Sequence, residues 1–164
     1  MSIELAKKIA KPFERLSLKA YFDPHPLGLP TQGYGRLLCR TPNYKSLRES
    51  GLTNEKAYEW LYTTFPDITE ETAEEWLEAD LLKAQRGVLK YTNVALNENQ
   101  LGALDSFAFN VGIGNYQIST MRRLINRGDF ELAGNEFIKW NKAGGIVLRG
   151  LTRRRLAERD LWFS

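Results

Sequence analysis

The chain has 164 residues, of which 43% are hydrophobic and 26% charged, so it can bury a proper core as one globular unit. Its net charge of +3 suits an anionic polymer as partner, whether nucleic acid, cell-wall glycan or membrane surface, without choosing among them. One cysteine, Cys39, excludes an intramolecular disulfide, and a Cys/His metal cluster is excluded because His25 is the one histidine. We expect Cys39 to be a packing residue and His25 a solvent-facing turn residue.

The sequence contains no apolar run near the ~20 residues that span a bilayer, so we expect no membrane anchor. The N-terminal text MSIELAKKIAKPFERL is charged throughout and lacks the apolar core of a signal peptide. We therefore expect a protein made in the cytoplasm without an export signal of its own.

The first two predicted elements are a helix and a small sheet. Apolar residues recur at helical spacing over residues 3–11. Pro12 ends this helix or restarts it, because an interior proline lacks a backbone donor and clashes with the preceding turn. From Tyr21 to Leu38, closely spaced prolines and glycines favour short strands joined by turns over any helix.

The rest of the chain is predicted to be mostly helical. Thr53 is a candidate N-cap for the helix in LTNEKAYEWLYTTF. Thr69 is the N-cap of a second helix that runs for about 20 residues, or roughly 30 Å. Four later helices are predicted from their start and stop signals: Asn99–Val111, Ser119–Asn126 ended by Gly128, Asp129–Lys142 ended by Gly144 and Gly145, and Thr152–Trp162. One small early sheet followed by many helices indicates an α+β fold.

Two acids frame the region between the first helix and the strands. Glu14 follows the predicted helix, and Asp23 comes nine residues later, where the chain can fold back and bring both carboxylates together. Glycoside hydrolysis needs such a pair, because one carboxylic acid protonates the leaving oxygen while a carboxylate serves the opposite face of the sugar. From spacing alone, an ion pair for Glu14 and a turn cap for Asp23 are the plainer alternatives.

The text around these acids resembles the active-site signature of phage-type lysozymes, glycoside hydrolase family twenty-four. FERLSLKAYFDP and GLPTQGYG are similar to Glu–Gly–x–x–Leu–x–Ala–Tyr–x–Asp followed by Gly–x–x–Thr–x–Gly–Tyr–Gly–His. ITEETAEEWLEADL resembles the start of the family's inter-lobe helix, and the text from NENQLGAL to AERDLW resembles its C-terminal lobe. The resemblance implies one lysozyme-like α+β domain over residues 1–164, with lobes at about 13–66 and 90–164 joined by a helix at about 69–89.

The resemblance also implies roles for particular residues. Glu14 matches the family's general acid, Asp23 its second carboxylate, and Thr31 the hydroxyl that helps to hold the attacking water. Gly33 and Gly35 would shape the turn below the active site. The positions that match the lining of the saccharide cleft are Leu37, Phe109 and Asn110.

From this resemblance we expect an endolysin that hydrolyses the β-1,4 bond between N-acetylmuramic acid and N-acetylglucosamine of peptidoglycan, by inversion through a water and without metal or organic cofactor. Access to the wall would depend on a holin-type membrane permeabiliser, and we expect a monomer with no nucleic-acid partner. Two alternatives stay open. One is a lytic transglycosylase giving anhydro products, which the presence of Asp23 and Thr31 disfavours, and the other is an inactive peptidoglycan-binding protein of the same fold.

The sequence departs from the family pattern near the acids. Arg15 stands where the family has glycine and Arg36 where it has histidine, and both bring positive charge, which favours ionised carboxylates. His-Pro-Leu lengthens the turn over residues 24–30. Residues 39–66 resemble an insertion relative to compact family members, for which packing is favoured and contact with the substrate is the alternative.

The remaining arginines and tryptophans have structural interpretations. Near the C-terminus we expect at least two arginines to pair with acids such as Glu158 rather than bind a polyanion; the candidates are Arg149, Arg153, Arg154, Arg155 and Arg159. Core packing is favoured over sugar stacking for the four tryptophans on helical stripes, which are Trp60, Trp76, Trp140 and Trp162.

Overall fold

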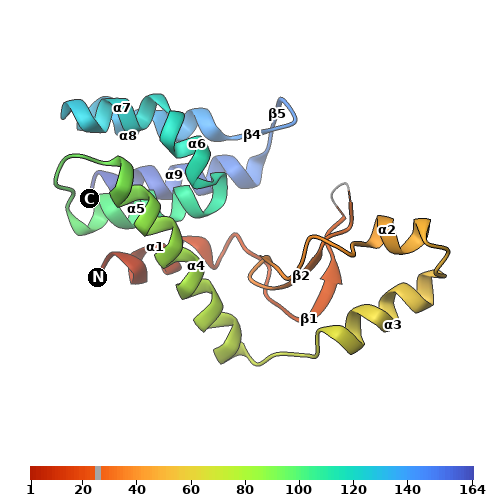
Figure 1. Ribbon diagram of the computed structural model, residues 1–164. Coiled ribbons are helices and arrows are strands. Elements are labelled where there is room, and N and C mark those ends of the chain that lie inside the picture. The colour runs from red at the N-terminus through yellow and green to blue at the C-terminus, as the bar shows by residue number, and fades with distance from the viewer. Residues whose placement is uncertain (25–26) are drawn as a thin grey trace. The chain divides into compact units, whose positions relative to one another are not determined.

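The computed structural model describes residues 1–24 and 27–164, and within them the chain forms two compact units (Figure 1). One unit contains residues 14–77, and the other combines residues 1–13 with residues 78–164. The first helix therefore belongs to the unit that the C-terminal half completes. The expected turn position of His25 lies outside the described residues.

The unit of residues 14–77 contains a three-stranded antiparallel sheet in the order β1-β2-β3. Its strands are β1 (Ser17–Phe22), β2 (Pro30–Gly33) and β3 (Arg36–Leu37), which confirms the prediction of short strands, although β1 begins earlier than predicted. Gln32 is buried and links the sheet to Pro66, in the segment before the helix of residues 70–91. Its Nε2 donates to the carbonyls of Leu18 and Pro66, each at 2.9 Å.

Two helices follow the sheet in this unit, α2 (Tyr44–Glu49) and α3 (Asn54–Thr64) (Figure 1). Thr53 caps α3 as predicted, accepting a hydrogen bond from the Lys56 N–H. The short helix α2 was not predicted; Asn43 and Ser46 begin it with a reciprocal capping box. Side chains from both helices join the sheet in a hydrophobic core made of Ala20, Phe22, Leu47, Ala57 and Leu61. Leu47, Ala57 and Leu61 of the segment 39–66 therefore pack in the core, as was favoured for this segment.

The longest helix, α4 (Glu70–Tyr91), begins in one unit and continues in the other, since Leu77 is the last residue of the first and Glu78 follows it. Its predicted cap is confirmed, because the Thr72 N–H donates to the Thr69 hydroxyl at 3.2 Å. Glu70 and Glu71 lie in its first turn, where the positive end of the helix dipole favours acids.

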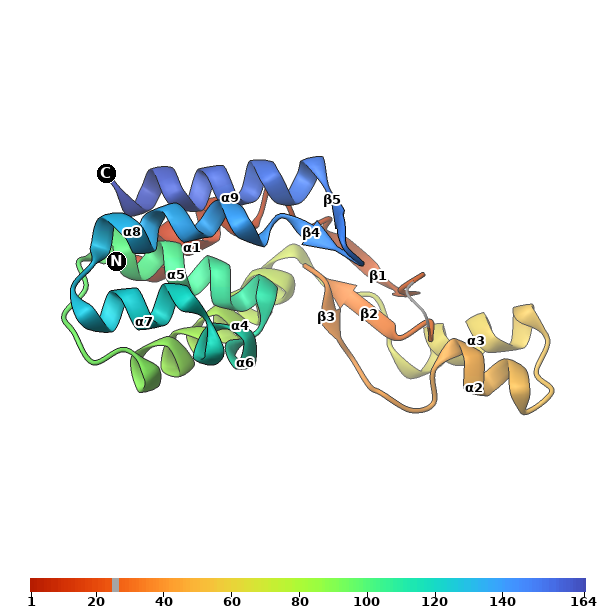
Figure 2. The same ribbon diagram turned by 90° about the horizontal axis from the view of Figure 1, so that it is seen from above.

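The unit of residues 1–13 and 78–164 is helical around α5 (Glu98–Val111), whose residues from Gly102 to Ala108 are buried. Against α5 pack α1 (Ser2–Ala10), which ends before Pro12, and α9 (Arg149–Trp162). Figure 2 shows the other elements of this unit, which are α6 (Ile113–Ile118), α7 (Thr120–Arg127), α8 (Phe130–Glu136), the 3-10 helix η1 (Phe137–Trp140), and a hairpin of β4 (Lys142–Ala143) and β5 (Ile146–Val147).

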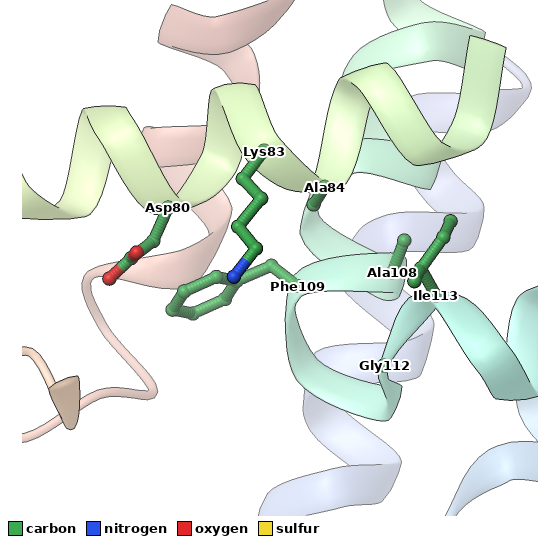
Figure 3. Close-up of a pocket in the computed structure, with 7 residues that line it drawn as sticks. All are labelled: Asp80, Lys83, Ala84, Ala108, Phe109, Gly112 and Ile113. Carbon is green, nitrogen blue, oxygen red and sulfur yellow. The ribbon is translucent and has the colours of Figure 1, made fainter. Parts of the chain in front are cut away.

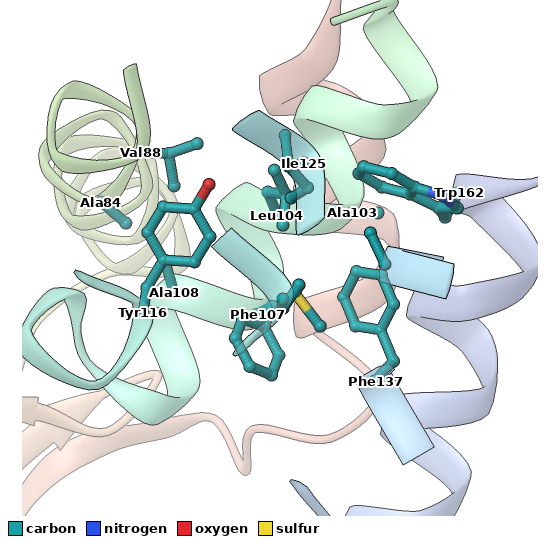
Figure 4. Close-up of a cluster of buried hydrophobic side chains, with 12 residues drawn as sticks. Ala84, Val88, Ala103, Leu104, Phe107, Ala108, Tyr116, Ile125, Phe137 and Trp162 are labelled. Atoms are coloured by element: carbon teal, nitrogen blue, oxygen red, sulfur yellow. The ribbon is translucent and has the colours of Figure 1, made fainter. Parts of the chain in front are cut away.

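The core of this unit combines aliphatic side chains with the aromatic rings of Phe107, Tyr116, Phe137 and Trp162 (Figure 4). The Phe107 ring meets Phe137 at 5.3 Å and Trp140 at 5.4 Å, in both cases edge to face, an arrangement that stabilises beyond the burial of area alone. Trp162 is buried, and its indole N–H donates to the Phe130 carbonyl at 2.9 Å. The expected core roles of Trp140 and Trp162 are therefore confirmed.

The expected structural arginines are also present. Arg154 and Arg155 are buried beside Glu158, with Nε···O distances of 3.2 Å and 2.8 Å. Ser106 of α5 donates to the same carboxylate at 2.8 Å. Burial raises the pKa of Glu158, and the two guanidinium groups oppose that rise. This network joins α9 to α5, because charges so deeply buried need partners.

Several predicted helix boundaries are wrong, and the physical reason is clear at three of them. The helix predicted from Asn99 begins at Glu98, because Asn97 and Gln100 form the capping box. The helix predicted to run to Lys142 ends with η1, since Gly144 and Gly145, with φ of 56° and 82°, form the turn of the β4–β5 hairpin instead. The helix predicted from Thr152 begins at Arg149, and the Thr152 hydroxyl donates to the preceding turn within it.

Candidate active site

One row of side chains crosses the small sheet from strand to strand. Tyr21 on β1 pairs with Thr31 on β2, and Thr31 pairs with Leu37 on β3. Residues directly opposite each other in antiparallel strands share a face, so these three side chains lie on the same face. Asp23 follows β1 directly, two residues after Tyr21, and the two-residue alternation of side chains along a strand places it on the same face as Tyr21.

Asp23 and Thr31 both donate a hydrogen bond to the same carbonyl. The backbone N–H of Asp23 donates to the Leu29 oxygen at 2.9 Å, and the Thr31 hydroxyl donates to it at 3.0 Å. Thr31 is 4% exposed, so its hydroxyl has a fixed direction. Because the hydroxyl proton is engaged, the oxygen of Thr31 is oriented as an acceptor.

Glu14 lies in the bend between α1 and β1 and is half-buried. Its neighbour is the turn between β2 and β3: a Cβ built on Gly35 would lie 3.6 Å from Glu14 Oε2. Gly35 has φ of 80°, a conformation that glycine adopts without strain. The predicted role of Gly35 in shaping a turn at the acid therefore agrees with the geometry.

Tyr21 also belongs to this site, although no role was predicted for it. Its pKa is raised above 10.0, first by burial and then by the negative charges of Asp23 and Glu14, while Arg15 opposes the rise. The negative charges of both carboxylates therefore disfavour ionisation of the same phenol, that of Tyr21. The pattern offered a signal, since Tyr21 stands two residues before Asp23 in a predicted strand and so belongs on the same face.

The two arginines that depart from the family pattern lie in different surroundings. Arg15 lines a hollow of about 300 Å³ together with Leu16, Ser17 and Tyr21. The guanidinium of Arg36 lies 5.0 Å from the centre of the Trp76 ring, a cation–π distance. Of the two, Arg15 is the one whose charge reaches the phenol of Tyr21.

Phe109 and Asn110 belong to the other unit. Phe109 lines a hollow of about 290 Å³ with Asp80 and Lys83 of α4 (Figure 3). Asn110 lines another, of about 320 Å³, with Trp140 among its neighbours. The structure thus groups Glu14, Asp23, Thr31 and Leu37 in one unit and places Phe109 and Asn110 in the second.

Other chemistries find little support in the part of the chain that the structure describes. Burial raises the pKa of the Cys39 thiol, which disfavours the thiolate, and its Sγ contacts the Pro42 carbonyl at 3.5 Å. Within residues 1–24 and 27–164, no three His, Cys, Asp or Glu side chains are grouped to hold a metal ion. Over the same described ranges, no helix has both the length and the apolarity to cross a membrane. The fold and the site define an α+β protein with two carboxylates near one half-buried phenol, that of Tyr21.

Comparison with known proteins agrees with that class. The family described as Phage lysozyme matches residues 11–158. The endolysin of Salmonella phage P22 is 34% identical over 147 residues, which make up 90% of this chain and 87% of that protein. The endolysin of Bacillus phage B103 is 45% identical over 97 residues, or 59% of this chain. The solved structure of the endolysin from Escherichia coli O157:H7 phage FAHEc1 matches with a TM-score of 0.73 and 30% identity, covering 98% of this chain and 91% of that one.

The chain therefore belongs to the phage lysozyme family, and the predicted lysozyme-like α+β fold is confirmed. It spans 37% of the length of the B103 endolysin, well under two thirds of that relative.

Proposed function

We propose that the chain is a peptidoglycan-degrading endolysin that hydrolyses the β-1,4 bond between N-acetylmuramic acid and N-acetylglucosamine. Membership of the phage lysozyme family supports a glycosidase, and the endolysin names of its relatives support peptidoglycan as substrate. The observation that carries the proposal is that Glu14 lies against the β2–β3 turn at Gly35 of the small sheet in which Asp23 and Thr31 donate to the same Leu29 carbonyl. A glycosidase needs two carboxylates that serve one sugar bond.

In this proposal Glu14 is the general acid and gives its proton to the glycosidic oxygen as that bond breaks. A water attacks the anomeric carbon from the opposite face, and Asp23 accepts the proton that this water loses. The Thr31 oxygen accepts the second O–H of the water, because its own proton is directed at the Leu29 carbonyl. Because Asp23 and Thr31 both donate a hydrogen bond to the Leu29 carbonyl, the base and the residue that accepts from the water keep a fixed position relative to each other.

Tyr21 is proposed as a positioning residue. Because its pKa is raised above 10.0, its hydroxyl stays protonated at neutral pH and can donate a hydrogen bond to a carboxylate. We further propose that Leu37, Phe109 and Asn110 contact the glycan and that the two units act as one lysozyme-like domain. Phe109→Ala is then expected to raise KM more than it lowers kcat, because a binding contact is removed.

The decisive experiment measures release of soluble fragments from purified peptidoglycan and the mass of each fragment. Glu14→Gln and Asp23→Asn are compared with wild type and with Glu55→Gln, an exposed acid of α3 in the same unit. Loss of a general acid or base is expected to lower the rate about 100-fold or more, whereas Glu55→Gln keeps the wild-type rate. Circular dichroism shows that each variant is folded.

The mass of the fragments separates the proposal from its alternatives. Hydrolysis gives reducing ends that have gained one water, and these are the expected products. Anhydro ends would instead identify a lytic transglycosylase. Binding to the wall without any released fragment would identify an inactive peptidoglycan-binding protein. An active Glu14→Gln variant would refute the assignment of the general acid.

We also propose that the chain accumulates in the host cytoplasm and reaches the wall through a holin-type membrane permeabiliser, acting there as a monomer without nucleic acid. The support is physical, since a folded chain with a charged surface does not cross a hydrocarbon layer unaided. The test is expression with and without a permeabiliser, and lysis at the same time in both cultures would contradict this part of the proposal.

A further inference from the structure

A second hollow in the unit of residues 14–77 has no role in the chemistry described above. It has a volume of about 360 Å³ and is lined by residues of β1, of the turn after it, of α2 and of α3. The lining residues that matter here are Phe22, Asp23, Gly28, Tyr44, Lys45 and Tyr58. Asp23 thus borders this hollow as well as belonging to the proposed catalytic pair.

The wall of the hollow consists of aromatic rings that are held in place by contacts with one another. The Phe22 ring lies 5.2 Å from Tyr44 and 5.2 Å from Tyr58, and the two tyrosine rings are 6.3 Å apart. Tyr44 is held further by its hydroxyl, which donates to Asn54 Oδ1 at 2.9 Å. Rings fixed in this way offer apolar faces to a ligand without a large loss of side-chain entropy.

The frame of the hollow is fixed by its backbone. The N–H groups of Tyr44 and Lys45 donate to the carbonyls of Gly28 and Leu27, at 2.8 Å and 3.1 Å. Gly28 has φ of 65°, and a Cβ at this position would lie 2.4 Å from the Cβ of Tyr44. At residue 28 the chain therefore lies so close to the start of α2 that only glycine fits.

The charge at the rim indicates the chemistry of the ligand. Lys45 is 59% exposed and has an ion-pair contact of 3.8 Å to Glu49, which is itself 66% exposed. An exposed pair at that distance contributes little, so the ammonium can exchange Glu49 for a ligand carboxylate at small cost. The described lining of the hollow thus combines an apolar wall with the exposed ammonium of Lys45.

We propose that this hollow is a subsite for the acidic stem peptide that the muramic acid of the substrate carries. Lys45 pairs with a carboxylate of the stem, and the rings of Tyr44 and Tyr58 cover its apolar part. The position follows from Asp23, because a group bound here is next to the sugar on which the proposed base acts. This inference rests on the proposed function, which supplies the substrate.

The test compares two forms of one substrate: glycan strands with their stem peptides, and the same strands after the stems have been removed by an amidase. Lys45→Gln is expected to lose about five- to tenfold more in kcat/KM on the stem-bearing form than on the stem-free form, because only the former offers a carboxylate to the ammonium. Lys56→Gln, an exposed lysine of α3 outside the hollow, is the matched control and should show no such difference.

Equal losses on the two substrates, or no loss on either, would overturn the subsite. A binding measurement keeps this result separate from failure of the proposed function. Titration calorimetry with a soluble stem-bearing disaccharide should show an affinity that falls with added salt in wild type and a weaker, less salt-dependent affinity in Lys45→Gln. If wild type cleaves no glycan but binds this ligand through Lys45, the catalytic proposal fails and the subsite stands. If the stem-free disaccharide binds equally well, the subsite fails.

Discussion

Asp105 is expected to make the stability of this protein depend on pH near neutrality. Its carboxyl is fully buried on α5, where Oδ2 accepts a hydrogen bond from Gln85 Nε2 at 2.7 Å. Gln85 also donates to the Ser2 hydroxyl at 2.8 Å, and none of the described residues donates to Oδ1 of Asp105. Burial raises the pKa of Asp105 from 3.8 to about 7, while hydrogen bonds from Gln85 and Ser2 oppose that rise.

The sign follows from the direction of that shift. A carboxyl with a raised pKa in the folded state holds its proton more tightly there than in the unfolded chain. Its contribution to the free energy of unfolding is therefore full below the unfolded value of 3.8 and is lost as the pH rises through about 7. The difference between the folded and unfolded pKa values corresponds to about 4 kcal/mol of the free energy of unfolding. About 2.5 kcal/mol of this stabilisation is lost between about pH 5 and about pH 8.

The assay is urea unfolding of wild type and Asp105→Asn at both pH values. The amide keeps the shape of the side chain and cannot ionise, so the free energy of unfolding of the variant relative to wild type should rise by about 2.5 kcal/mol from the lower to the higher pH. Glu131→Gln, an exposed acid in the same unit, is the control and should follow wild type. A difference between Asp105→Asn and wild type that is the same at both pH values would refute the reasoning.

Two further predictions concern stability. Glu158→Gln leaves two buried guanidinium groups without their counter-charge and should lower the free energy of unfolding by about 3–5 kcal/mol, whereas exposed Asp160→Asn should change it little in the same urea titration. Gly28→Ala forces a Cβ against Tyr44 and should cost about 1–3 kcal/mol. Gly51→Ala has a similar positive φ but open space around its Cβ, so an equal loss there would show that strain alone, not contact, decides.

The sequence predicted those parts of the fold that depend on local chemistry. Thr53 and Thr69 cap helices as predicted, because a side-chain oxygen before a helical stripe satisfies donors within a few residues. Gly144 and Gly145 were assigned to the wrong element for the same reason. A pair of glycines ends a helix or turns a hairpin equally well, and what decides is the pairing of Lys142 and Ala143 with later residues.

Part of the candidate site also follows from local sequence, and part depends on pairing between distant segments. The placement of Asp23 and Thr31 around one carbonyl follows from a turn that the prolines and glycines already indicated. The involvement of Tyr21 depends on strand register and on the return of Glu14 towards the turn at Gly35. Register is set by pairing between segments, which spacing along one segment does not determine.

The assignment of α1 to the unit of residues 78–164 has a consequence for the order of events during synthesis. Residues 14–77 leave the ribosome as a complete unit, while the first thirteen residues still lack the helices on which they pack. Ala6 and Ala10, which are fully buried in the finished protein, can find that cover only after α5 and α9 have been made. Helix α1 is therefore translated before the helices on which it packs and is among the last elements to reach its native contacts.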